Sequence, residues 1–511
     1  MSSSQSGVML GPRFTVLLLA GVAGMSLLAI GQGVSVGLAA PFGLVALGLL
    51  CLRPMLGTVL FLALAYMNAP VLIGRVIGSP QIAAMGVTAL VGFPVLVYMF
   101  KRRGIVVDYT FLLMLLFLGS LLGSSFVAVD VHVAFAWITV YVVEGVLMYF
   151  LVLNAVRSLG MLRAAIWTMV VVSAFLSSLG LYQELTHKYQ AQFGGLAQRD
   201  LGRGIAEDDD GTGLVRQRSE VLVSNRAAGP VNGPNRFAQI LIVVLPLAFF
   251  RFRDERKRWV RLLALGCMLL ILAGFAITYS RGGILTFVGL VMIMIFLGYI
   301  RWWQMLLGGV LLTLVVLVVA PGFLGRLETF RTLPQLLSQR DTVEGHGAIR
   351  GRLTEMLAGV HCFFDYPLLG VGPGQYMPFY SVKYMENPEI AFRSLATQRR
   401  AHCLYAELSA ETGIVGILLF LGIVGTLLAR LWSLRRRFRR KQPGLANTAT
   451  AFWLGIMGYL GSAVFLHLAF QRYLWILLAL AGATVQILEK EWKRLAEPVS
   501  GAPSARDLLH D

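Results

Sequence analysis

About fourteen apolar stretches in this chain approach the roughly 20 residues that a helix needs to cross a bilayer. Because backbone polar groups cannot stay unpaired in hydrocarbon, stretches of this kind cross a membrane as helices. Hydrophobic residues make up 57% of the 511 positions and charged residues only 14%, which excludes a soluble globular protein. The sequence therefore predicts an all-α polytopic integral membrane protein with about 12–14 transmembrane helices.

The predicted spans form a nearly continuous series that two long polar segments interrupt, at residues 183–234 and 321–402. The first span has no basic segment before it and runs directly into the second, so we interpret it as a membrane helix and not as a cleavable signal. The full series is predicted at residues 13–31, 33–51, 55–74, 81–100, 109–129, 132–156, 162–182, 235–250, 259–279, 282–300, 303–320, 403–430, 451–471 and 473–489.

The net charge of +18 does not indicate nucleic-acid binding, because the basic clusters lie beside membrane spans, where they mark cytoplasmic loops. With fourteen spans and both termini inside, every cluster falls on the cytoplasmic side and both long loops fall outside. The clusters are Lys101–Arg103, Arg157 with Arg163, Arg251–Arg261, Arg435–Lys441 and Lys490–Arg494. The predicted organisation is helices over 1–182, an external loop over 183–234, helices over 235–320, a large external loop over 321–402, and helices with a cytoplasmic tail over 403–511.

The first external loop ends in a turn-rich stretch, Gly229–Arg236, which leads into a helix expected to start at Asn235. The loop also carries an acidic run, Glu207–Asp210. This run lacks the alternating ligand spacing of a calcium loop, so a solvated flexible segment is favoured over a divalent-metal site. The arginines of the loop are Arg199, Arg203, Arg216, Arg218 and Arg226.

The second external loop contains an amphipathic helix, expected over Arg350–Phe364, that would lie on the outer leaflet or pack across the span ends. A glycine-rich stretch follows at Tyr366–Tyr376, with the sequence YPLLGVGPGQY. Its glycines suit either backbone amides that bind phosphate or a tight corner between two helices, and the residues alone leave both open. The apolar face of the helix consists of Leu353, Met356, Leu357, Val360, Phe363 and Phe364.

A basic run, Gln398–Arg400, leads directly into the polar start of a long apolar helix. Ionisable groups persist near membrane depth mainly where they function or pair, so His402, Glu407 and Glu411 mark a candidate functional site. The plainer alternative is a histidine at a helix start, with carboxylates that pair with arginines and hold the loop. Two other ionisable residues, Glu144 and His467, are predicted mid-span, where internal hydrogen bonding is favoured over a ligand role.

No metal or nucleotide site is expected, since the sequence has no DxD-like pair in a folded context and no glycine-rich nucleotide loop. The four cysteines form no CxxC pair and have no metal-ligand spacing. Cys362 and Cys403 are predicted to share the outer compartment, which leaves a disulfide between them as an open alternative.

Four segments between residues 230 and 430 resemble the O-antigen ligase and polymerase superfamily of bacterial polysaccharide assembly. They are GPNRFAQ at Gly233–Gln239, SRGG at Ser280–Gly283, the YPLLGVGPGQY stretch, and HCLYAELSAETGIVG at His402–Gly416. The resemblance implies a GT-C-like fold in the bacterial inner membrane, with an active site on the periplasmic side. It also implies that a glycan moves from an undecaprenyl-diphosphate carrier to an acceptor hydroxyl, with no cofactor and no metal.

The acceptor distinguishes the functions that remain open. A ligase, which we favour, uses lipid A-core, whereas a polymerase uses another lipid-linked repeat unit. A polysaccharide-lipid transporter or flippase is a more distant alternative. It would show inverted repeats with broken helices at the midplane, and the sequence has no convincing internal repeat.

The resemblance carries over His402 and Arg281 as catalytic residues. Histidine has an unperturbed pKa of about 6.5, which suits it to accept the proton of an acceptor hydroxyl. Guanidinium groups bind phosphate oxygens in pairs, so Arg281 would stabilise the departing diphosphate, although an interfacial arginine also commonly extends to lipid headgroups. Further candidates are Arg399, Arg400, Arg236, Arg350 and Arg352 for the diphosphate, and Glu407, Glu411, Tyr376 and Gln375 for the acceptor or sugar.

Overall fold

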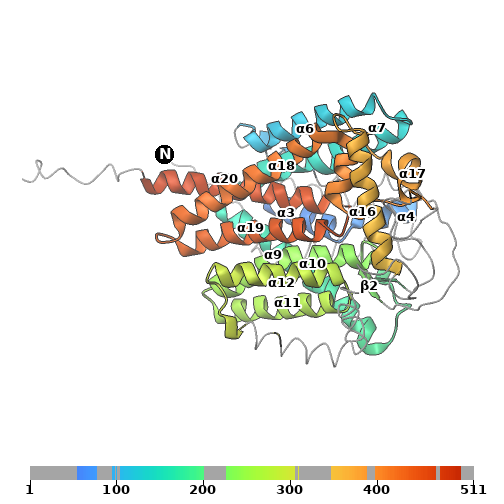
Figure 1. The fold of residues 1–511 in the computed structure, drawn as a ribbon. Coiled ribbons are helices and arrows are strands. Elements are labelled where there is room, and N and C mark those ends of the chain that lie inside the picture. Colours follow the sequence, from blue (N-terminus) through green and yellow to red (C-terminus); the bar gives the residue numbers. More distant parts are fainter. Residues whose placement is uncertain are drawn as a thin grey trace, which may run out of the picture.

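A computed structural model of the protein describes residues 54–77, 104–200, 226–304, 347–387, 397–467 and 472–496, with a few further positions among residues 92–100 and at 309. Apart from two short strands, the regular elements in these ranges are helices (Figure 1). The predicted all-α polytopic architecture is therefore confirmed for the described part of the chain.

The helices that precede the first external loop are α3 (Pro54–Tyr66), α4 (Ala69–Ile77), α6 (Tyr109–Ser125), α7 (Val131–Val140), a π-helical segment η1 (Tyr141–Leu147), α8 (Met148–Ala155) and α9 (Leu159–Thr186). The central helices are α10 (Pro234–Asp254), α11 (Arg258–Ala276) and α12 (Arg281–Phe296). The second loop contributes α16 (Gly347–Asp365), η3 (Tyr376–Tyr380) and α17 (Ser381–Met385), and the chain continues through α18 (Leu404–Phe438), α19 (Pro443–Ala463) and α20 (Arg472–Ala496).

Six of the described helical segments are long and apolar enough to cross a membrane. They are the continuous α7–η1–α8 segment (Val131–Ala155), α9, α10, α11, α18 and α20, and shorter apolar helices occur at Met55–Tyr66, Tyr109–Ser125 and Arg281–Phe296. Most predicted spans within the described ranges coincide with one of these helices to within a few residues. The predicted spans at 13–31, 33–51 and 303–320, and most of 81–100, lie outside the described residues.

One predicted span is divided into two helices, and another is displaced along the chain. The span at 55–74 is two helices, because Asn68 adopts a left-handed backbone (φ 58°) and donates its side-chain amide to the Pro230 carbonyl at 2.9 Å. The span at 451–471 starts and ends eight residues earlier, as α19. Pro443 suits the first turn of a helix, and the polar first turns are buried against the protein, where Asn447 donates to Asp254 at 2.7 Å. Hydropathy does not show where a helix begins when its polar first turns are buried and hydrogen-bonded within the protein.

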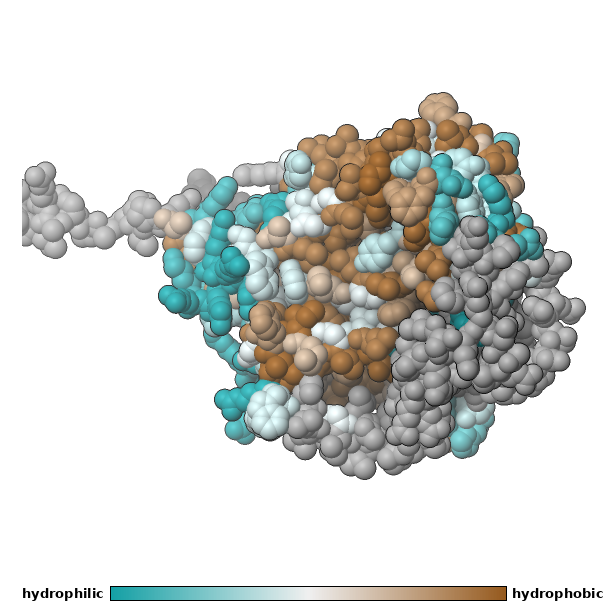
Figure 2. Space-filling view, viewed as in Figure 1, coloured by the Kyte–Doolittle hydropathy of each residue, from teal (hydrophilic) through white to brown (hydrophobic). Residues whose placement is uncertain are grey.

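The centre of the bundle is formed by α10 and α20, which are apolar on all sides as buried helices must be. Every residue from Phe237 to Ala248 and from Arg472 to Val485 is buried. Around them, α6, α11 and α12 keep large apolar side chains exposed on their outer faces. Figure 2 shows these faces as part of an apolar belt that ends at a hydrophilic rim, as expected for a protein that sits in a bilayer.

The basic clusters that the structure describes meet at one end of the bundle. Arg163 pairs with Glu255, which joins the start of α9 to the end of α10. Phe438 packs against Trp492, with ring centroids 5.4 Å apart, and joins the ends of α18 and α20. The position of these clusters at one end of the bundle agrees with the prediction that they share one side of the membrane. The side that this end faces stays a prediction. The division of the chain into helical segments and external loops also stays a prediction.

The opposite end holds the two long loops. In the first, β1 (Gln198–Asp200) pairs antiparallel with β2 (Arg226–Gly229), and the Ala227 amide donates to the Ile277 carbonyl at 3.0 Å. Arg199 is buried and bonds to Gln183, Glu184 and the Gly180 carbonyl of α9, so its charge joins the loop to that helix. Helix α10 begins at Pro234, within one residue of the predicted start.

In the second loop, α16 confirms the predicted amphipathic helix, and it lies crosswise over the ends of the bundle helices (Figure 1). Its buried face differs from the apolar face predicted. The residues buried against α18 are small or polar, whereas Phe364 is 69% exposed. Small side chains allow close approach, since a Cβ on Gly359 would lie 3.0 Å from that of Ala401. The buried positions are Gly351, Thr354, Glu355, Ala358, Gly359 and Cys362.

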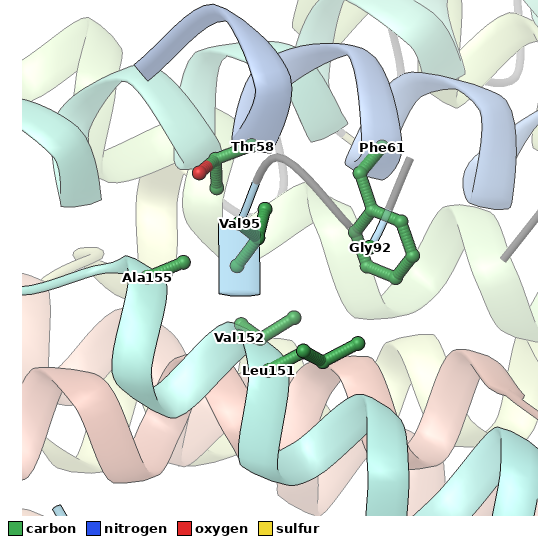
Figure 3. Close-up of a pocket in the computed structure, with 7 residues that line it drawn as sticks. All are labelled: Thr58, Phe61, Gly92, Val95, Leu151, Val152 and Ala155. Carbon is green, nitrogen blue, oxygen red and sulfur yellow. The ribbon is translucent and has the colours of Figure 1, made fainter. Parts of the chain in front are cut away.

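An apolar seam joins α3 to α8 away from both loops (Figure 3). Phe61 of α3 faces Val95 and Leu151, and a Cβ on Gly92 would meet Leu151 Cδ1 at 3.2 Å. The gap is lined only by apolar surface and is too narrow for a water molecule. It is a packed contact between helices and offers no room for a ligand.

Candidate functional site

The turn that precedes α18 presents His402 at the loop end of the bundle. His402 has a left-handed backbone with φ 46°, a conformation that costs a non-glycine residue about 1–3 kcal/mol. Glu407, one turn into α18, stabilises this turn with both carboxylate oxygens. Oε2 accepts from the Ala401 amide at 3.0 Å, and Oε1 accepts from Arg400 Nη1 at 2.8 Å. Glu407 therefore holds the turn that carries His402, and its predicted role toward the acceptor or sugar stays a prediction.

Glu355 of α16 lies beside the imidazole of His402. Its Oε2 is 3.6 Å from His402 Nε2, which is an ion-pair distance, and its Oε1 accepts from Arg399 Nη1 at 3.2 Å. The Glu355 side chain is 2% exposed and that of His402 10%, whereas Arg399 is 40% exposed. A buried carboxylate thus connects the histidine to an accessible cation.

On its other side, His402 meets His467, with the ring centroids 5.4 Å apart and nearly perpendicular. His467 follows the end of α19, and so it lies at the loop end of the bundle and not mid-span as predicted. Its Nε2 is 3.2 Å from Arg236 Nη2. Because a guanidinium can only donate, His467 Nε2 accepts this bond, and the neutral ring carries its proton on Nδ1.

The surroundings of His467 favour its neutral form. Burial lowers the pKa of His467 well below its usual value, and the positive charges of Arg400 and Arg236 lower it further, with smaller contributions from His402 and Arg352. Four cationic or ionisable side chains therefore surround one buried histidine. This concentration of positive charge suits a site that receives an anion.

Arg400 is more enclosed than Arg399. Besides its ion pair with Glu407, its guanidinium lies 4.7 Å from the ring centroid of Trp137 in α7, and the side chain is 7% exposed. Arg400 thereby connects the α18 turn to α7.

The glycine-rich stretch at 366–376 forms a corner against α18. The Val371 amide donates to the Ala410 carbonyl at 2.9 Å, and the Gly372 amide donates to the Glu411 carbonyl at 3.0 Å. The Glu411 carboxylate in turn accepts from the amides of Gly374 and Tyr376. These amides form hydrogen bonds within the protein. This favours the interpretation of the stretch as a tight corner between helices, and not as a phosphate-binding loop.

Gln375 and Tyr376 are both buried in this corner. Gln375 exchanges two hydrogen bonds of 2.9 Å with the backbone of Asp130, and the Tyr376 hydroxyl donates to the Glu355 carbonyl at 3.4 Å. Burial raises the pKa of Tyr376 well above its usual value. Both side chains therefore support the corner, and their predicted contact with a sugar stays a prediction.

Arg281 is the first residue of α12 and is partly exposed. Ser280 caps this helix, accepting from the Gly283 amide at 3.2 Å. A Cβ on Gly282 would lie 2.8 Å from Phe465, which places the start of α12 against the connector that carries His467. Arg350 and Arg352 are partly exposed on α16.

No group of three His, Cys, Asp or Glu side chains is arranged to hold a metal ion among the described residues, and the acidic run at 207–210 lies outside them. Cys362 and Cys403 are buried free thiols in this structure. Burial raises the pKa of Cys362 to about 12.

Sequence reasoning missed Glu355 and misplaced His467. A carboxylate among the small residues of α16, on the face opposite the large apolar ones, was the available signal for Glu355. For His467 the available signal was Pro443. A proline suits the first turn of a helix, so it indicates that α19 begins at 443 and ends before His467.

The chain between residues 266 and 421 matches the family model of the O-antigen ligase. The predicted family resemblance is confirmed. The matched segment runs from α11 to α18 and includes Arg281, Glu355 and His402, and the match supports a ligase or polymerase type of function. Arg236 and His467 lie outside it. No curated protein matches the chain.

Proposed function

We propose that the protein is a membrane glycosyltransferase of the O-antigen ligase type. It would transfer a glycan from an undecaprenyl-diphosphate carrier to a hydroxyl of lipid A-core at the periplasmic face of the bacterial inner membrane. The proposal includes a GT-C-like fold, inversion at the anomeric carbon and no metal. The observation that carries it is the contact of His402 with Glu355 at the loop end of the bundle, within the family match.

His402 is the proposed general base. It is the ionisable residue that the α18 turn presents, in a backbone conformation that the Glu407 contacts maintain. Glu355 beside it favours the protonated imidazole that forms when the acceptor hydroxyl loses its proton. We assign Glu355 as a positioning residue, because it acts through His402 and through Arg399.

The arginines at this end are the proposed binding groups for the diphosphate. Arg281, Arg236 and Arg399 are each partly exposed, so a phosphate oxygen can reach them. Arg400 is too enclosed for direct contact in this conformation, and it contributes positive potential instead. Guanidinium groups suit this role because they donate paired hydrogen bonds to phosphate oxygens.

In the proposed step, the acceptor oxygen attacks the anomeric carbon while His402 removes its proton. The bond between that carbon and the diphosphate oxygen breaks, and its electron pair leaves with the diphosphate. The arginines stabilise the charge that develops on the leaving group. His402 then releases the proton to solvent.

A deletion strain complemented with the wild-type chain or with His402→Ala tests this function through its lipopolysaccharide gel pattern. A ligase predicts loss of all long chains from lipid A-core in the deletion strain, while lipid-linked polymer persists. Single repeat units on the core would identify a polymerase instead. Unchanged long chains and unchanged lipid-linked polymer would contradict both.

A further inference from the structure

A cavity of about 540 Å³ lies at the basic end of the bundle, opposite the loop end that holds His402. It forms where the start of α6, the second half of α18 and the last turns of α20 meet. Figure 1 shows this end of α20 on the side of the bundle away from α16. The cavity therefore has no contact with the proposed transferase site.

Three cations and two carboxylates line this cavity, so its formal net charge is +1. Arg430 and Glu489 neutralise each other, since Arg430 Nη2 is 2.9 Å from both carboxylate oxygens. Asp108 is engaged within the protein, because it accepts from the Phe111 amide and from the Tyr149 hydroxyl, each at 2.8 Å. Lys490 and Lys493 also line the cavity, and neither has an ion pair or hydrogen bond within the described part of the chain.

Gln486 is a further polar residue that lines this cavity. The side-chain Nε2 of Gln486 has no exposure to solvent and no partner among the residues that the structure describes. Because Nε2 is enclosed by the protein, a ligand in the cavity would meet other atoms of Gln486 and the two lysines. Gln486, Lys490 and Lys493 recur at helical spacing on one face of α20, and all three line the cavity.

An apolar track leads away from the cavity along α6. Tyr109, which lines the cavity, is 61% exposed, and the same helix face continues with Leu112 at 48% and Leu116 at 59%. These positions follow the spacing of one helix face, so they form a stripe that faces lipid. A cationic, donor-bearing cavity joined to an apolar stripe matches an anionic headgroup attached to acyl chains.

We propose that this cavity binds the headgroup of an anionic phospholipid. Lys490 and Lys493 supply the positive charge and the hydrogen-bond donors, and the α6 stripe receives an acyl chain. Basic pockets between membrane helices are known to suit such headgroups. A free phosphate ion would use the same cations but would gain nothing from the stripe.

Native mass spectrometry of the full-length protein measures the affinity for phosphatidylglycerol and, as the zwitterionic comparison, for phosphatidylcholine. The test variant is Lys490→Gln/Lys493→Gln. The matched control is Arg439→Gln/Arg440→Gln, which removes two exposed charges at the same end outside the cavity. Loss of two surface cations should weaken phosphatidylglycerol binding about thirty-fold in the test variant and by less than about three-fold in the control.

Equal losses in the two variants, or equal affinity of the wild type for both lipids, would overturn the proposal. Complete displacement of phosphatidylglycerol by millimolar inorganic phosphate would assign the cavity to free phosphate instead. A third variant, Leu112→Ser/Leu116→Ser, isolates the stripe. It should weaken lipid binding and leave phosphate binding unchanged, and unchanged lipid affinity would remove the stripe from the site.

Discussion

Gly413 lies so close to Leu368 that a Cβ at position 413 would stand 2.2 Å from the Leu368 carbonyl oxygen. Gly413 interrupts α18 with φ 64° and ψ −165°, and the next residue, Ile414, donates its amide to the Pro367 carbonyl at 2.7 Å. The contact is reciprocal, because a Cβ on Gly370 would stand 2.3 Å from the Glu411 carbonyl carbon. Two segments more than forty positions apart are therefore packed backbone against backbone.

Gly413→Ala should destabilise the protein by at least about 3 kcal/mol, because the backbone conformation is strained for alanine and the added methyl group meets a carbonyl. Gly422→Ala is the control, since a Cβ there has open space in the same helix and alanine favours a helix by about 1 kcal/mol or less. Thermal unfolding in detergent should show a large decrease in unfolding temperature for Gly413→Ala and no decrease for Gly422→Ala. Similar unfolding temperatures would show that the corner can relax.

His402→Ala should lower the transfer rate about 10²–10⁴-fold while the affinity for the lipid-diphosphate donor survives, because general base catalysis acts on the rate. The control is His361→Ala, which changes an exposed histidine on α16. Rates and donor affinities of the purified variants decide the outcome. Normal turnover by His402→Ala would place the base elsewhere, and loss of turnover by His361→Ala would point to that histidine.

Glu355→Gln should reduce the transfer rate about 10–100-fold with little change in donor affinity, and it should move the acid limb of the pH–rate profile to lower pH. The reason is that a carboxylate beside His402 favours the protonated ring, and an amide does not. Glu386→Gln removes an exposed carboxylate of the same loop and serves as the control. A lower rate with an unshifted pH profile would assign Glu355 a purely structural role.

Arg281→Ala should weaken donor binding as well as transfer, because the proposed guanidinium contact exists before and during the reaction. Arg281→Lys should restore little of either, since lysine lacks the paired donors of a guanidinium. The measurements are the donor affinity and the transfer rate of each purified variant. Full activity with lysine would mean that only the charge at this position matters.

The stability of the protein should fall with pH below about 6.5, the ordinary pKa of an unfolded histidine, in part because of His467. Burial depresses the pKa of His467 in the folded state, so the unfolded chain binds a proton first as the pH falls. The loss can reach about 1.4 kcal/mol per pH unit. His467→Gln should reduce this acid sensitivity, measured as unfolding temperature from pH 8 to pH 5, whereas His132→Gln at an exposed position should not. An unchanged slope in His467→Gln would contradict the assignment.

The sequence by itself determined the class and most of the spans. Apolar length and composition suffice for this, because a bilayer requires helices of about 20 apolar residues whatever their order. The same reasoning predicted the α16 helix and the start of α10, since periodicity and turn residues are local signals.

Only the tertiary structure decided how the polar groups are used. Glu407 and Glu411 look equivalent in sequence, yet one holds the His402 turn and the other holds the glycine corner. Glu355 became important only because α16 buries its small-residue face, which brings a carboxylate to His402. Which cation meets which carboxylate depends on contacts between segments far apart in the chain, and local hydropathy carries no information about such contacts.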